Sequence, residues 1–289
     1  MKPISIEDPS DDRLAPYAGL KDAALRRAIE GGGPPGGPGG GPSDRASSGF
    51  SDGPGTFIAE GSLVLGRLLK SPYRLQSVLV TAQRLPVVAG LLGEAEAPVF
   101  VVSQELMNAV TGFNIHRGVL AIASRRALPD PVDLLAGAGR IAVLEGINDH
   151  ENLGVIFRNA AGFALDGVLL SPECCDPLYR RSVRVSMGYV LEVPYARLEP
   201  WPTALESVSA AGFLLVGLTP DPEAKDLRGL GLDGHSRVAF LLGAEGPGLS
   251  PEALRAVDVR ARIAMAPGVD SLNVGSAAAV AFHAAFGRG

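Results

Sequence analysis

The sequence predicts an α/β protein with two domains, and three observations support this prediction. Runs of aliphatic residues alternate with helical patterns along the chain from Phe57 onward. A length of 289 residues is enough for two domains of ordinary size. Residues 129–139, which are rich in Pro, Gly and Asp, separate two such alternations and are the best linker. We therefore expect an N-terminal domain over 1–128 and a C-terminal domain over 140–289.

The N-terminal domain is expected to be a small α/β domain with an insertion. Residues 22–30 have helical character, whereas residues 31–55 consist largely of Gly, Pro and Ser and have almost nothing apolar to bury. Such a composition favours a disordered insertion. The later elements are predicted as a helix over 57–70, a strand over 75–80, a helix over 84–92, a strand over 99–102, a helix over 104–110 and a strand over 118–124.

The C-terminal domain shows a second alternation of strands and helices. Alternation of this kind implies a mostly parallel sheet with helices on both faces. A strongly apolar helix over 273–286 is expected to end the domain. The strands are predicted over 141–144, 167–170, 213–218, 238–242 and 259–263.

The composition indicates a globular protein of the cytoplasm. Hydrophobic residues make up 46% of the chain and charged residues 20%. The first residues carry acids where an export signal needs an apolar core, and no apolar stretch reaches the roughly 18 residues of a membrane span. The cysteines, Cys174 and Cys175, are adjacent, which disfavours a conventional disulfide between them. With four histidines they offer no zinc spacing, so no metal is expected.

The net charge of −5 argues mildly against a dedicated nucleic-acid-binding module. An enzyme that meets RNA transiently needs only a local basic patch. For any single arginine, a solvated surface position is the commoner interpretation. The candidates for an RNA-binding patch are Arg180, Arg181, Arg184, Arg117, Arg125 and Arg126.

Three segments combine glycines with polar side chains where a strand passes into a helix or loop, and such junctions often bind ligands. The first segment runs from Asn152 to Ala160. Asn152 has the residue type of a helix N-cap. At about 100° per residue, Arg158 points away from the apolar face of the helix. From these residues alone, a helix cap and a solvated arginine are a commoner interpretation than a catalytic site.

The second segment, 241–249, follows an apolar strand. Its glycines allow the backbone to turn sharply and approach a ligand, and Glu245 lies within the turn. The third segment, 263–274, leads into the last helix, where Ser271 and Asn273 are natural capping residues. A loop followed by a capped helix explains both segments without a ligand, and this interpretation is compatible with ligand binding, because a ligand-binding loop must also be a good loop.

Taken together and in this order, the three segments resemble the motifs of the SpoU/TrmH family of RNA ribose 2′-O-methyltransferases. The resemblance implies the knotted SPOUT fold, with a trefoil knot near the C-terminus, and S-adenosylmethionine as cofactor. The implied catalytic-site residues are Asn152, Arg158, Glu245, Ser271 and Asn273. The implied cofactor-binding residues are Leu218, Gly243, Ile263, Met265 and Leu272.

The resemblance extends outside these motifs. Residues 180–188 look like the family's basic helix, which faces RNA. The N-terminal region from Phe57 onward is similar to the small ribosomal-protein-like substrate domain that many members carry. It therefore implies a homodimeric enzyme acting on RNA, with rRNA favoured over tRNA. A tRNA 2′-O-methyltransferase, a non-catalytic knotted RNA-binding protein and an α/β enzyme acting on a small molecule stay as alternatives.

Overall fold

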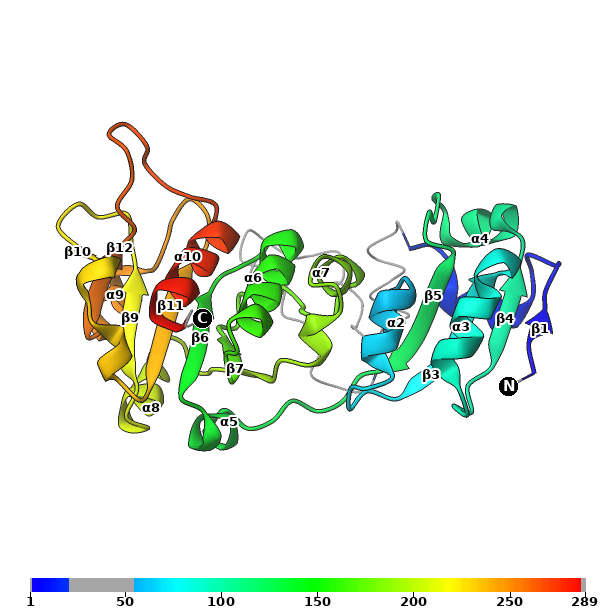
Figure 1. The fold of residues 1–289 in the computed structure, drawn as a ribbon, viewed down its shortest axis with the longest axis horizontal. Coiled ribbons are helices and arrows are strands. Elements are labelled where there is room, and N and C mark those ends of the chain that lie inside the picture. The colour runs from blue at the N-terminus through cyan, green and yellow to red at the C-terminus, as the bar shows by residue number, and fades with distance from the viewer. Residues whose placement is uncertain (1, 21–54, 287–289) are drawn as a thin grey trace, which may run out of the picture. The chain divides into compact units, whose positions relative to one another are not determined.

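Two sheets organise the chain, a mixed five-stranded sheet and a parallel seven-stranded sheet (Figure 1). The computed structural model describes residues 2–20 and 55–286. The predicted helical stretch 22–30 and residues 31–54 of the predicted insertion lie outside the described part. The first unit comprises the described residues up to Ala127 together with Leu178–Leu191, and the second comprises Leu128–Pro177 and 192–286.

The first unit is built on the five-stranded sheet, whose order is β1-β4-β3-β5-β2. Its strands are β1 (Ile4–Ser5), β2 (Thr56–Glu60), β3 (Leu75–Thr81), β4 (Val99–Val102) and β5 (Val119–Ser124). Its helices are η1 (Asp12–Tyr17), α2 (Ser62–Leu68), η3 (Ala82–Arg84), α3 (Leu85–Leu92), α4 (Gln104–Thr111), α7 (Arg180–Val185) and η4 (Tyr189–Leu191). β5 is antiparallel to both of its neighbours, β2 and β3.

The prediction of one helix over 57–70 is wrong. Its first part is β2, in which Phe57, Ile58 and Ala59 are all fully buried. A short apolar run fits a strand buried on both faces as well as a helix, so periodicity alone does not separate the two. Gly61 then turns the chain with φ of +97°, a conformation that glycine adopts readily, and α2 begins at Ser62.

The segment Leu178–Leu191 brings α7 and η4 into the first unit. The Arg67 side chain of α2 donates a hydrogen bond from Nε to the Met187 carbonyl oxygen, at 2.9 Å. Its guanidinium also lies 3.6 Å from the centre of the Tyr189 ring. These contacts join α2 to a segment more than 100 residues later in the chain.

The second unit is built on the seven-stranded sheet, whose order is β10-β12-β9-β11-β6-β7-β8 and whose pairs are all parallel. Its strands are β6 (Arg140–Glu145), β7 (Gly167–Leu170), β8 (Tyr195–Arg197), β9 (Leu214–Leu218), β10 (Lys225–Asp226), β11 (Val238–Gly243) and β12 (Val259–Arg262). Its helices are α5 (Pro131–Gly137), α6 (His150–Gly162), α8 (Leu205–Ala210), η5 (Leu227–Gly229), η6 (Leu232–Gly234), α9 (Pro251–Ala256) and α10 (Val274–Phe286).

Helices cover both faces of this parallel sheet, as the alternation predicted. On one face α5, α8 and α9 contribute Leu135, Leu205 and Ala253 to a common apolar core. On the other face the Phe240 ring of β11 lies 6.1 Å from the Phe282 ring of α10. Figure 1 shows α10 beside α6, and these two helices pack against each other.

The five predicted strands of the second domain are all present, with ends that differ by one residue at most. The short strands β8 and β10 were not predicted. Residues 129–139, expected as a linker, contain α5, and Leu135 of this helix is buried in the core of the second unit. No helix in the described part of the chain is long and apolar enough to cross a membrane.

We expect the Glu60→Gln variant to be less stable than the wild type by about 2 kcal/mol. The Glu60 side chain is only 6% exposed, and its Oε2 lies 2.6 Å from Nη1 of Arg180, whose guanidinium also covers the Phe113 ring. The amide would leave the Arg180 charge without its partner in a largely buried position. Denaturant unfolding followed by circular dichroism, with the exposed Glu96→Gln as control, measures the effect. Equal stability of the two variants would contradict it.

Candidate active site

A cavity of about 440 Å³ opens at the carboxyl ends of β9, β11 and β12. In open parallel sheets, ligands bind at this edge, because the loops that leave the strands converge there. The described residues that line the cavity are Leu218, Thr219, Pro220, Leu242, Gly243, Ala244, Glu245, Gly246, Gly248, Ala261, Ile263, Met265, Ser271, Leu272, Asn273, Val274 and Ala277. All five residues predicted to bind the cofactor are therefore at one cavity.

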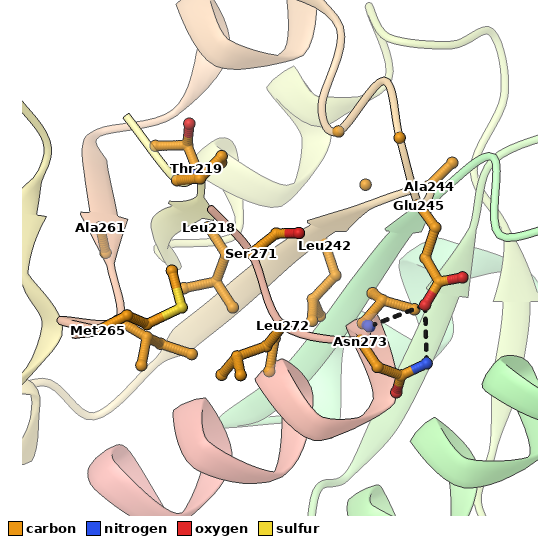
Figure 2. A pocket seen from close by; sticks show the side chains of 17 residues that line it. Leu218, Thr219, Leu242, Ala244, Glu245, Ala261, Met265, Ser271, Leu272 and Asn273 are labelled. Carbon is orange, nitrogen blue, oxygen red and sulfur yellow. Dashed lines mark hydrogen bonds between the residues drawn. The ribbon is translucent and has the colours of Figure 1, made fainter. Parts of the chain in front are cut away.

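The cavity has an apolar end and a polar end. Figure 2 shows the side chains of Leu218 and Met265 gathered at one end. At the other end, Glu245 and Asn273 face each other and are joined by a hydrogen bond. Ser271 lies between the two ends. A ligand with one apolar and one polar part would find a matching surface at each end.

The side-chain amide of Asn273 links the three sequence segments. Its Nδ2 donates to Oδ1 of Asn152 and to Oε1 of Glu245, both at 2.7 Å. Its Oδ1 accepts from the Ser276 backbone N–H, at 3.1 Å, and so caps the start of α10. Both the capping interpretation and the site interpretation of Asn273 are thus consistent with its contacts.

Asn152 does not cap α6. The cap is Asp149, whose Oδ1 accepts from the backbone N–H groups of Glu151 and Asn152, both at 2.8 Å. The Asn152 side chain is 8% exposed and is directed to Asn273. A buried amide held by a distant segment is typical of a site residue rather than of a local cap.

Arg158 lies apart from the other predicted catalytic residues. It is exposed on α6, as its position off the apolar face predicted, and is about 9 Å further along the helix axis than Asn152. It is not one of the described residues that line the cavity. Glu245, Ser271 and Asn273 line the cavity, and Asn152 is joined to Asn273 by a hydrogen bond, whereas Arg158 does not line the cavity of its own chain.

Gly243 is required by the shape of the loop that follows β11. A Cβ added at this position would lie 2.1 Å from the Gly248 carbonyl carbon, far inside van der Waals contact. The loop is closed by a hydrogen bond of 3.0 Å from the Gly248 N–H to the Ala244 carbonyl oxygen. The missing side chain thus makes room for the loop itself, which in turn forms one wall of the cavity.

The predicted RNA-binding arginines fall into different places. Arg180 and Arg184 of α7 lie 2.6 and 4.0 Å from Glu60, and Arg117 approaches the adjacent Gly61. Arg181, on the same helix, is exposed. Arg125 and Arg126 follow β5, whereas Arg117 precedes it, so a strand of about 20 Å separates them.

The cysteines are buried free thiols in the second unit. Burial raises the pKa of the Cys174 thiol to about 11, and it raises the pKa of the Cys175 thiol as well. Both groups therefore remain protonated at neutral pH and are poor nucleophiles and poor metal ligands. Among residues 2–20 and 55–286, no group of three or more His, Cys, Asp or Glu side chains is arranged to hold a metal ion.

Comparisons with known proteins agree with this geometry. The family model described as SpoU rRNA Methylase family matches residues 139–283. An uncharacterized tRNA/rRNA methyltransferase of Mycobacterium tuberculosis is 50% identical over 227 residues, which are 78% of this chain and 79% of that protein. The 23S rRNA (guanosine-2′-O-)-methyltransferase RlmB of Bordetella pertussis is 27% identical over 228 residues, which are 76% of this chain and 92% of that protein.

A similar fold is known from a crystal structure. The AdoMet-bound rRNA methyltransferase of Sinorhizobium meliloti has a TM-score of 0.75 at 22% identity, over 97% of this chain and 96% of that one. This similarity confirms the predicted SPOUT α/β fold, while the trefoil knot stays a prediction. Since the family model covers half of the chain and the mycobacterial relative shares half of its aligned residues, the chain belongs to the SpoU rRNA methylase family.

Proposed function

We propose that this protein transfers a methyl group from S-adenosylmethionine to a ribose 2′-hydroxyl in RNA, and that its substrate is rRNA in the cytoplasm. The observation that carries the proposal is the pair of hydrogen bonds from the Asn273 amide, which joins the side chain of Asn152 to Glu245 in the cavity wall. Membership of the SpoU rRNA methylase family supports RNA as the substrate. The relative named RlmB, matched over 92% of its length, supports rRNA and the 2′-hydroxyl.

The cavity suits S-adenosylmethionine in size and in chemistry. Its volume of about 440 Å³ lies within the range of small-ligand sites, roughly 300–1,000 Å³. Leu218, Ile263 and Met265 offer an apolar surface to a flat base, and the loop over Gly243 brings backbone groups close. The polar end at Glu245 suits the charged amino-acid part. The bound cofactor would supply an electrophilic methyl group on a sulfonium.

The residues of this chain would align the two reacting groups and assist the hydroxyl. Asn152 and Asn273 hold each other and keep the polar end in one arrangement before the substrate arrives. We assign to Arg158 a contact with the ribose or its neighbouring phosphate, which stabilises negative charge developing on the 2′-oxygen. A guanidinium has a pKa above about 12 and is a poor base, so water or a substrate phosphate takes the proton.

We also propose a homodimer that forms through α6 and α10. These helices are in close contact, because a Cβ on Gly275 would lie 2.7 Å from a Val155 methyl group and Asn159 donates to the Gly275 carbonyl oxygen. On α10, Val280 is 42% exposed although it is apolar. Pairing of this surface with a second copy would bury it. Arg158 would then serve the cavity of the partner, which accounts for its position outside its own.

For RNA docking we propose the end of the first unit's sheet where β2 stops and β5 starts. Arg180 and Arg184 lie beside Glu60 there and Arg117 lies beside Gly61, so positive charges outnumber the negative one among these four charged side chains. Such an excess favours phosphate contacts, which position RNA without specifying its sequence. Arg125 and Arg126 lie at the other end of β5 and are a secondary candidate.

Gly243→Ala is expected to weaken S-adenosylmethionine binding more than about tenfold. The new methyl group would collide with the Gly248 backbone and displace the loop that forms one wall of the cavity. Calorimetric titration measures the dissociation constant. Gly229→Ala is the matched control, because a Cβ at Gly229 meets nothing within 4 Å. An unchanged dissociation constant in Gly243→Ala would place the cofactor elsewhere.

Arg158→Ala is expected to lower kcat at least about 100-fold while cofactor affinity and melting temperature stay near the wild-type values. The side chain is exposed and lies outside the cavity, so its removal disturbs neither packing nor the cofactor. The exposed Arg255→Ala of α9 is the control. Near-normal turnover of Arg158→Ala would refute the catalytic role.

The same two variants test the dimer. In a randomly mixed population of Arg158→Ala and Gly243→Ala subunits, half of the dimers carry one of each kind. The Arg158→Ala subunit keeps an intact cavity, and the Gly243→Ala subunit keeps Arg158. A mixed dimer therefore has one complete site only if Arg158 acts on the cavity of the partner. We then expect recovery of about a quarter of the wild-type activity. No recovery above the separate variants would contradict the shared site.

The whole proposal is tested by methyl transfer to RNA from cells that lack this protein. Purified protein is incubated with S-adenosylmethionine labelled in its methyl group and with separated rRNA and tRNA. A 2′-O-methyl group blocks alkaline cleavage of the adjacent phosphodiester, so the label is expected in alkali-resistant dinucleotides of rRNA. Label in tRNA would show that the substrate is tRNA instead of rRNA. Label in alkali-labile nucleotides would contradict transfer to the ribose.

A further inference from the structure

The cavity loop is held at its exit by a residue that neither the motifs nor the cavity lining include. The loop leaves β11 at Gly243 and ends at Ser250, the N-cap of α9. The backbone N–H of Ser250 donates to Oε2 of Glu145, at 2.8 Å. Glu145 is the last residue of β6 and lies beside Gly243 in the register of the two parallel strands. The start and the exit of the loop are therefore both fixed at the same edge of the sheet.

The second oxygen of the same carboxylate is also used. Oε1 of Glu145 accepts from the indole Nε1–H of Trp201, at 2.7 Å. Trp201 packs against the apolar core that contains Leu249, the residue just before the loop exit, and Ala253 of α9. Glu145 thus connects the loop to Trp201 by hydrogen bonds, and the core connects the same two elements by packing.

Only a carboxylate satisfies both partners at once. Each partner is an N–H donor, and an ionised carboxylate offers an acceptor oxygen to each. A glutamine of the same shape has one acceptor oxygen, and its NH₂ group would face the other N–H. One donor would then lose its partner in a half-buried position, which costs more than a hydrogen bond replaced by water.

We propose that Glu145 is a positioning residue for the cofactor cavity, and that it couples the order of the cavity loop, residues 243–250, to the surroundings of the Trp201 indole. The inference rests on the proposed cofactor site. Loop residues Glu245, Gly246 and Gly248 line the cavity, so a ligand that orders them also orders the Ser250 N–H and its carboxylate partner. Trp201 is the only tryptophan of the chain and is not among the described residues that line the cavity. Its fluorescence therefore reports on the loop rather than on direct contact with the ligand.

The first test needs no variant. The full-length wild-type protein is titrated with S-adenosylhomocysteine while calorimetry and tryptophan emission are recorded in parallel. We expect a change of emission that saturates with the calorimetric binding curve. Calorimetric binding without any change of emission would overturn the link to Trp201. Absence of calorimetric binding would instead contradict the proposed cofactor site, so the two failures are distinguishable.

The second test compares Glu145→Gln with Glu252→Gln, which makes the same chemical change at an exposed position of the first turn of α9. We expect Glu145→Gln to bind S-adenosylhomocysteine about tenfold more weakly and to lose most of the emission change, whereas the control behaves as the wild type. In methyl transfer, the KM for S-adenosylmethionine should rise about tenfold while kcat stays within about threefold. Equal affinity of both variants, or a fall in kcat at unchanged KM, would overturn the positioning role.

Discussion

The candidate site depends first on the side-chain amide of Asn273. One nitrogen satisfies two acceptors from two other segments of the chain, while the oxygen of the same amide caps α10. An aspartate at this position could not donate, and a serine could not reach both acceptors while capping the helix. The amide therefore fixes the start of α10, the side chain of Asn152 and the loop residue Glu245 relative to one another. Each of the three segments would be an ordinary loop or helix start without the other two.

The parallel sheet supplies the frame on which this arrangement rests. Because β9, β11 and β12 run in the same direction, the segments that follow them leave at one edge and can share a ligand. Three structural features then restrain the loop after β11. Gly243 gives it room, the Gly248 N–H closes it, and Glu145 holds its exit. The cavity wall is therefore ordered before the ligand arrives, so binding does not incur the entropic cost of ordering that wall.

The sequence predicted those parts of the fold that are encoded locally. The strand over 167–170 is a short apolar run between polar segments, and the third site segment leads into an apolar helix with capping residues before it. The prediction failed for β2, where a strand and a helix meet at Gly61 within one continuous apolar pattern. The placement of Leu178–Leu191 in the first unit depends on contacts with residues such as Arg67, more than 100 positions away. No local pattern encodes such a pairing.

The site residues also divide into those that the sequence predicted and those that only the three-dimensional structure revealed. The predicted residues at the cavity were implied by the resemblance of three segments to the motifs of the SpoU/TrmH family, and one of these residues, Leu218, lies outside all three segments. Glu145 was missed because a single acid at the end of a strand is common, and its partners lie 56 and 105 positions later. The exposed side of α6 was predicted from its periodicity. That Arg158 lies outside the cavity of its own chain follows only from the three-dimensional arrangement.

The central claim is that the segments that follow β9, β11 and β12 in the second unit form a single cofactor site. Hydrogen–deuterium exchange of the full-length protein, with and without S-adenosylhomocysteine, tests it most directly. The account predicts slower exchange together in residues 218–220, 242–250 and 263–277, with no change in β3 and β4 of the first unit. Protection confined to one of the three segments, or protection in the first unit in their place, would contradict the account.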